Sequence, residues 1–132
     1  MTRQQFNVEG YWKVIVWYDL DFSLLSYVHR DLSSIGFSGK SIDRLFNELR
    51  ESYIKAVTCS NEEYHASVVI LKKHTSKEDY INSIAHEAVH VKQAMLSAYD
   101  VEDSGEPPAY TLGYLVMKMY GVFKAFLCDC RA

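Results

Sequence analysis

The chain has few of the features that mark secreted proteins or zinc ribbons. Only three of its 132 residues are cysteines, Cys59, Cys128 and Cys130, and no two of them form the Cys-x-x-Cys spacing of zinc ribbons and redox motifs. The N-terminal segment has an arginine but no apolar stretch after it, so the sequence predicts no secretory signal peptide. An odd number of cysteines suits a reducing compartment, and we expect a cytoplasmic protein.

The sequence also lacks an excess of one charge sign. Its 14 basic and 17 acidic residues are spread along the chain and leave a net charge of -3. Proteins that bind nucleic acid or an anionic membrane usually carry a basic patch. The sequence therefore predicts neither nucleic acid nor a membrane as a partner.

No long apolar run is free of charged residues. The best candidate for a membrane span, residues 107–128, has Lys118 at its midpoint and Lys124 beyond it. A lysine at the centre of a bilayer costs roughly 2.5 to 3.5 kcal/mol on insertion scales. We expect this segment to be a buried helix of a soluble domain.

The hydrophobic pattern that is present predicts a small α+β fold. With 48% hydrophobic residues, the chain is long enough to form a single domain over residues 1–132 with its own core. Runs of β-branched and aromatic residues predict strands at 10–19, 53–59 and 63–73. Apolar residues at three- and four-residue steps predict helices at 21–35 and, capped by Ser41, at 41–51.

Two more helices are predicted in the second half of the chain. Thr75 and Glu78 have the spacing of a capping box, which predicts a long helix from there to about Tyr99. Residues 100–108 hold four acids and both prolines, so they form a loop. Because proline is tolerated in the first turn of a helix, the last helix is expected to begin at Pro107 or Pro108 and to reach about residue 128.

The long helix contains the sequence His86-Glu87-Ala88-Val89-His90 at its middle. Residues four apart lie one turn above each other, so the two imidazoles would point toward one place. That is the geometry that two nitrogen ligands of one zinc ion need. Glu87 would lie off the metal but close enough to take a proton from an attacking water.

A catalytic zinc usually has three protein ligands. A third histidine six residues after the second, with a glycine before it, is excluded, because those positions are Leu96 and Gln93. Glu106, 16 residues after His90, is our choice for the third ligand if the last helix folds back. Glu102 and Asp103 are the substitutes, and Glu106 could instead only stabilise the positive end of a helix dipole.

The motif and the following Glu106-Pro107-Pro108-Ala109 resemble the zincin superfamily of metallopeptidases, and within it the glutamate-zincin branch. In that branch the third ligand often lies in a Glu-x-x-Ala segment of the next helix. The element order is also similar to the minimal zincin-like fold, a small sheet packed on helices with a central HExxH helix and a C-terminal ligand-bearing helix. The resemblance covers residues 63–128. The first half of the chain resembles the family only in the order of its helices and strands.

The resemblance implies a zinc-dependent metallopeptidase with one zinc ion and a peptide or protein substrate. His86, His90 and Glu106 would be the ligands and Glu87 the general base. A strand between residues 53 and 73 would pair with the extended substrate. Tyr110 and Tyr114 would be catalytic residues that stabilise the transition state, although tyrosines at helical spacing are more often core residues.

Two other interpretations remain open at this point. In its short length the chain also resembles minimal zincin domains of bacterial and phage proteins. A chain of this length could lack a full substrate cleft and be a catalytically weak or inactive metal-binding domain. Such a domain would act as a regulatory or phage or mobile-element interaction module. In the third interpretation the motif is accidental, and the protein is a structural, helix-rich domain.

Overall fold

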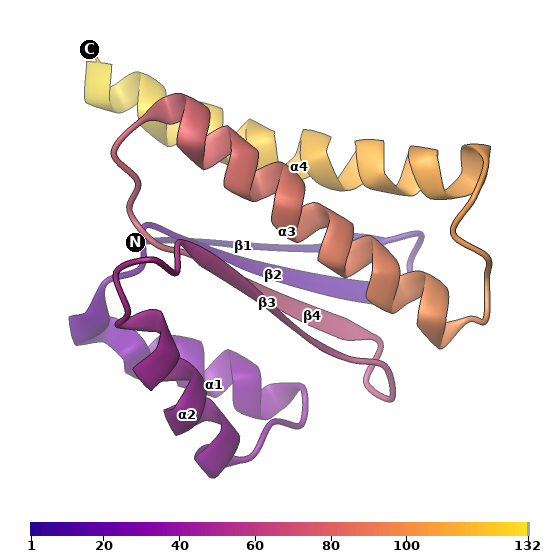
Figure 1. Ribbon diagram of the computed structural model, residues 1–132, viewed down its shortest axis with the longest axis horizontal. Coiled ribbons are helices and arrows are strands. Elements are labelled where there is room, and N and C mark those ends of the chain that lie inside the picture. The colour runs from indigo at the N-terminus through magenta and orange to yellow at the C-terminus, as the bar shows by residue number, and fades with distance from the viewer. Residues whose placement is uncertain (132) are drawn as a thin grey trace.

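A four-stranded mixed sheet lies at the centre of the fold, with two helices on each face (Figure 1). The computed structural model describes residues 1–131, with side chains as far as residue 125. The strands are β1 (Thr2–Val8), β2 (Trp12–Tyr18), β3 (Ala56–Asn61) and β4 (Ala66–Leu71), and their order in the sheet is β1-β2-β4-β3. β1 and β3 are therefore the two edge strands.

The strand directions follow from the connections. β1 and β2 are antiparallel neighbours, as are β3 and β4, because a short turn joins each pair. β2 and β4 are parallel, and the two helices of the first half cross between them. Both central strands are buried on both faces, which explains their continuous apolar runs.

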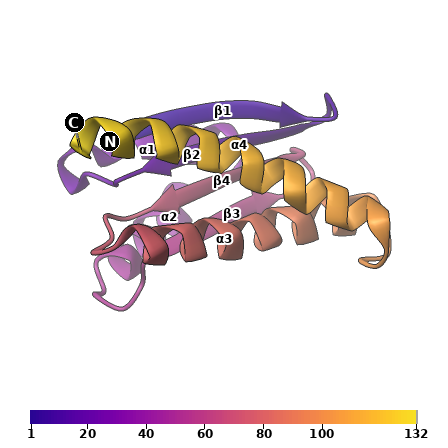
Figure 2. The same cartoon turned by 90° about the horizontal axis from the view of Figure 1, so that it is seen from above.

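The helices form a layer on each face of the sheet. On one face lie η1 (Phe22–Leu24), α1 (Leu25–Ser34) and α2 (Gly39–Leu49), and on the other lie α3 (Lys77–Ala98) and α4 (Glu106–Arg131) (Figure 2). Alternate residues of β2 supply the two cores. Val14 and Val16 pack under α3 and α4, whereas Ile15 and Trp17 pack against α1 and α2. The α+β class predicted from the sequence is confirmed.

The strand predicted at residues 10–19 is the second strand and not the first. The sequence pattern missed β1, because an edge strand needs few apolar residues and β1 offers mainly Phe6 and Val8. The turn into β2 places Glu9 and Gly10 at φ values of 52° and 80°, which a tight hairpin turn requires. The predicted strands at 53–59 and 63–73 are the antiparallel pair β3 and β4.

Two predicted helix caps were wrong, one by three residues and the other by one. Ser38, and not Ser41, caps α2, and Ser76, and not Thr75, caps α3 by accepting a hydrogen bond from the amide of Asp79 at 3.0 Å. In both places hydroxyl residues lie close together, and the pattern alone does not say which one takes the cap conformation. α4 begins at Glu106, so both prolines lie in its first turn.

α4 also contains the segment that was weighed as a membrane span. Within the part of the chain that the structure describes, no helix is long and apolar enough to cross a bilayer. Leu115, Met119 and Phe123 of α4 are buried against the sheet and α3. The predicted helix is therefore confirmed, but only one of its sides is buried, since Met117 and Tyr120 are exposed. The side chains of Cys128 and Cys130 lie outside the described residues.

Candidate metal centre

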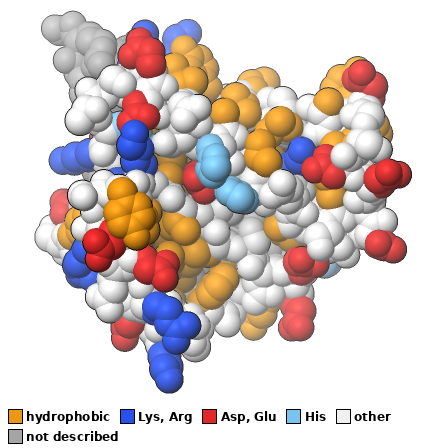
Figure 3. All heavy atoms as spheres, in the orientation of Figure 1, with side chains coloured by type: hydrophobic (Ala, Val, Ile, Leu, Met, Phe, Trp, Pro, Cys, Tyr) orange, Lys and Arg blue, Asp and Glu red, His pale blue; other side chains and the backbone are white. Residues whose placement is uncertain are grey.

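The residues of the predicted motif lie on two different sides of α3, one exposed and one buried. Tyr80, Ile84, Ala88, Val91 and Met95 recur at three- and four-residue steps and form the buried stripe. His86 and His90 lie on the outer side, and Figure 3 shows histidine side chains at the surface in the middle of this face. Glu87 lies between the two sides and is only 5% exposed.

The two imidazoles converge. Nε2 of His86 and Nε2 of His90 are 3.2 Å apart. Ligand nitrogens about 2.0 to 2.1 Å from a tetrahedral zinc ion are about 3.3 to 3.4 Å from each other. The distance also suits an N–H···N hydrogen bond between neutral imidazoles. The pair therefore already has the spacing that two zinc ligands need.

Glu87 is held by a residue of the sheet. The hydroxyl of Thr58 in β3 donates a hydrogen bond of 2.9 Å to Oε1 of Glu87. The other carboxylate oxygen, Oε2, lies 3.9 Å from Nε2 of His86. One oxygen is thus fixed by the strand while the other lies beside the histidine pair, the arrangement that a general base for an attacking water needs.

A groove runs between α3 and the edge strand β3 at this point. Its volume is about 360 Å³, and its lining joins residues of the strand to the motif: Ala56, Val57, Thr58, Ser60, His86, Glu87, His90 and Ala94. Figure 1 shows β3 at the front of the sheet, with α3 on one side of it and α2 on the other. The histidine pair therefore faces an open groove along the edge of the sheet.

The outer edge of β3 has backbone groups for a further strand. The amide of Lys72 donates to the carbonyl of Lys55, so this pair and every second pair after it is hydrogen-bonded to β4. The N–H and C=O groups of Ala56, Thr58 and Ser60 consequently point away from β4. Ala56, Thr58 and Ser60 line the same groove as His86 and His90. The backbone groups of these three residues that point away from β4 therefore lie beside the histidine pair.

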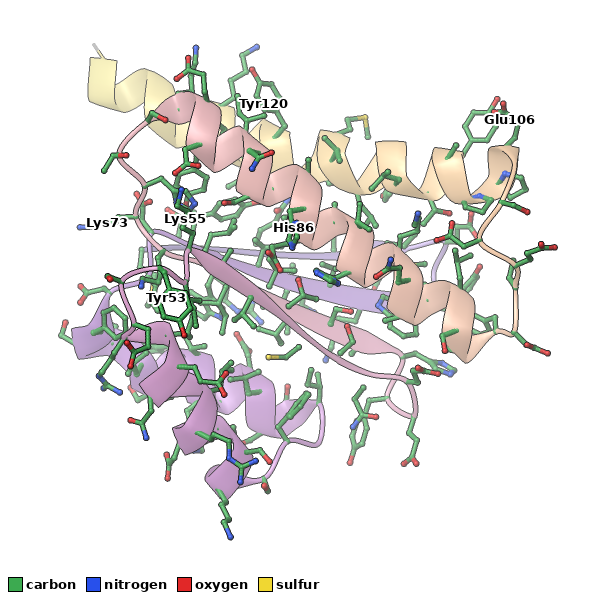
Figure 4. The ribbon with its side chains drawn as sticks, in the orientation of Figure 1. Tyr53, Lys55, Lys73, His86, Glu106 and Tyr120 are labelled. Atoms are coloured by element: carbon green, nitrogen blue, oxygen red, sulfur yellow. The ribbon has the colours of Figure 1, made fainter. Side chains whose placement is uncertain are left out.

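The structure does not bring Glu106 to the histidines. Figure 4 shows His86 near the middle of α3 and Glu106 at the first turn of α4, far along the molecule. α3 continues eight residues beyond His90 to Ala98, which is about 12 Å at about 1.5 Å per residue. Because α4 starts from that end and runs back beside α3, its first turn lies level with the end of α3.

No acid of α4 lies level with the histidines either. The segment of α4 that runs back past them, residues 111–127, contains no His, Cys, Asp or Glu. Of the two substitutes, Asp103 forms an ion pair of 3.1 Å with Lys92, and Glu102 is exposed in the loop. Among the described side chains, no group of three or more His, Cys, Asp and Glu residues is placed to hold a metal ion.

Tyr110 and Tyr114 lie at the other edge of the sheet. Together with Val8, Glu9 and Thr111 they line a cavity of about 500 Å³ beside the turn between β1 and β2. Tyr110 is 73% exposed, and the hydroxyl of Tyr114 lies 3.5 Å from the carbonyl oxygen of Asn7. The structure therefore does not join either tyrosine to the motif.

Thr58 is the site residue that the sequence pattern did not single out. The available signal was weak, namely two hydroxyl residues, Thr58 and Ser60, on the face of β3 that also carries Ala56. A comparison of the chain with family models, with curated proteins and with solved structures found no match. The residues and their geometry therefore carry the functional argument.

Proposed function

We propose that His86 and His90 bind one zinc ion and that the protein is a zinc-dependent metallopeptidase. The observation that carries the proposal is the convergence of the two Nε2 atoms, 3.2 Å apart, beside a buried carboxylate and an open strand edge. Imidazole nitrogens are common ligands of zinc, which when bound polarises a carbonyl group and eases the deprotonation of water.

The chain itself supplies the rest of the chemistry. Glu87 would take a proton from the attacking water through Oε2 and return it to the leaving nitrogen, while Thr58 holds Oε1. The outward backbone groups of Ala56, Thr58 and Ser60 would pair with an extended peptide and hold its backbone along β3. The substrate class proposed is therefore a peptide or a protein segment in extended form.

Hydrolysis with and without Glu87 tests the enzyme. We expect the zinc-loaded protein to cleave members of a library of extended peptides, with product detected by mass spectrometry. Glu87→Gln should bind zinc as the wild type does and lose at least about a hundredfold in rate, because it removes the general base. Cleavage by Glu87→Gln at the wild-type rate would contradict the proposed role of this residue.

A metal-binding interaction module is the second candidate function. It is favoured by the finding that only two of the three predicted ligands come together in the described structure. A protein partner could then complete the coordination of the metal. Stoichiometric zinc binding by a wild type that cleaves no peptide of the library would select this function, as an inactive zincin-like domain.

The proposed location is the cytoplasm. Cys59, the one cysteine whose side chain the structure describes, is a free, half-buried thiol in β3, and the chain has an odd number of cysteines. Free cysteines of this kind are typical of proteins in a reducing compartment. Detection of the protein in the oxidising exterior, with Cys59 in a disulfide, would contradict this location.

A further inference from the structure

A second cavity borders β3 on the face away from the histidines. It lies between β3 and α2 and has a volume of about 190 Å³. Its wall is mainly apolar, and its polar lining residues, Ser41, Arg44 and Glu48 of α2, are exposed. The apolar lining consists of Leu32, Phe37, Ile42, Leu45 and Cys59.

The side chains of β3 alternate between this cavity and the groove of the metal centre. Successive side chains of a strand point to opposite faces, and in β3 Thr58 lies toward α3 whereas Cys59 lies toward α2. A peptide strand added along the free edge continues the same alternation. The peptide residue opposite Thr58 would face the histidines, and the residues on either side of it would face α2.

The chemistry of the wall identifies the side chain that fits. Burial raises the pKa of the Cys59 thiol to about 12, so the thiol is neutral and apolar at neutral pH. Ile42 is buried, Leu45 is half-buried, and neither brings a polar group to the interior of the cavity. The polar lining groups belong to exposed residues of α2, so a charged peptide side chain that reached the buried part of the cavity beside Ile42 would lose its hydration there. An apolar side chain would instead be removed from water.

We propose that the cavity between α2 and β3 selects an apolar side chain, of the size of leucine or phenylalanine, next to the peptide residue that faces His86 and His90. The inference rests on the proposed function, because it takes the peptide along β3 as the substrate. It adds a specificity site on the face of the sheet opposite to the metal centre, with the half-buried Leu45 in its lining.

Positional scanning of the peptide tests this inference in two ways. Both measurements, of cleavage and of binding, use one series of fluorescently labelled extended peptides. The peptides are varied at one position at a time among Leu, Phe, Ser and Asp. Cleavage is measured with the zinc-loaded wild type, and binding is measured by anisotropy with the metal-free protein. We expect one position at which Leu or Phe improves both readouts roughly tenfold over Asp.

Variants of Leu45 locate the preference. Leu45→Glu should abolish it, while Leu25→Glu, the same change at a half-buried leucine of α1 away from the cavity, should retain it. Leu45→Ala should move the preference toward Phe, and Leu45→Phe should move it toward smaller residues. These opposite shifts cannot come from loss of folding, which thermal unfolding of each variant measures independently.

The outcomes separate the inference from the proposed function. Cleavage without a preference for an apolar residue, or with one that Leu45→Glu leaves intact, would overturn the inference and leave the metallopeptidase standing. Binding with the Leu45-dependent preference but no cleavage and no zinc would support the cavity and overturn the metallopeptidase. No binding and no cleavage of any peptide would overturn both.

Discussion

The two edges of the sheet differ in chemistry more than in shape. The β1 edge adjoins a cavity of about 500 Å³, whose polar groups are the exposed carboxylate of Glu9, two phenols and the hydroxyl of Thr111. The hydroxyls of Tyr114 and Thr111 contact backbone carbonyl oxygens. At the β3 edge, two imidazoles and a buried carboxylate point into a groove of about 360 Å³. Convergence of lone pairs, and not the size of the hollow, distinguishes the candidate site.

The packing of the last two helices explains the difference. α3 contacts β3 and β4, whereas α4 contacts β1. The exposed sides of these two helices therefore face opposite edges of the sheet. Glu87 of α3 contacts Thr58 at the β3 edge, while the first turns of α4 place Tyr110 and Tyr114 at the β1 edge.

The largest effect is expected from the loss of one histidine. His90→Ala removes one of the two converging nitrogens, and we expect the affinity for zinc to fall at least about a hundredfold. Loss of a residue that only hydrogen-bonds a metal ligand costs up to about a hundredfold, and loss of a ligand should cost no less. Isothermal titration with zinc measures this. Unchanged affinity in both His90→Ala and His86→Ala would show that zinc binds elsewhere.

A smaller effect is expected at Thr58, which acts through Glu87. Thr58→Val keeps the shape of the side chain but removes the hydrogen bond to Oε1, so the carboxylate loses its fixed position. We expect kcat for peptide cleavage to fall about tenfold with little change in KM, as for other misplaced catalytic groups.

Thr58→Ser is the matched control for Thr58→Val, because it keeps the hydroxyl and removes only a methyl group. We expect its kcat to be close to that of the wild type, and zinc affinity to be similar in both variants. Equal loss of kcat in the two variants would mean that packing of the strand, and not the hydrogen bond, supports catalysis.

For Glu106, the sequence predicts a third zinc ligand, whereas the structure places the residue far from the histidines. Since Glu106 is exposed at the start of α4, far from the histidines, Glu106→Gln should change zinc affinity by less than about fivefold. Isothermal titration again provides the measurement. A loss as large as that of His90→Ala would restore Glu106 as the third ligand and require α4 to begin closer to the motif when zinc is bound.

The smallest effect is expected at the β1 edge. Tyr110→Phe and Tyr114→Phe remove hydroxyls that lie beside β1 and its turn. We expect peptide cleavage to change by no more than about twofold, as for surface substitutions remote from a site. A rate loss of the size seen with Thr58→Val would contradict the assignment of chemistry to the β3 edge alone.

Much of the fold could be predicted from periodicity. Local patterns of apolar residues encode the long helix around residues 86–90, the pair β3 and β4, and the last helix. β1 was missed because an edge strand carries a weak pattern. The caps at Ser38 and Ser76 were missed because neighbouring hydroxyls compete for the same role.

The candidate site was only half predictable. The spacing of His86 and His90 depends on one helix, so the sequence was enough to indicate their convergence. The contact of Thr58 with Glu87 depends on strand order and on which face of β3 each residue occupies. The position of Glu106 depends on how far α3 continues past His90 before the chain turns, which a motif does not encode.

A crystal structure of the zinc-loaded protein, with anomalous data at the zinc edge, tests the central claim most directly. We predict a single anomalous peak about 2.0 to 2.1 Å from Nε2 of both His86 and His90, in the groove beside Thr58. A peak elsewhere, or no peak from protein saturated with zinc, would contradict the assignment of the metal centre to the β3 edge.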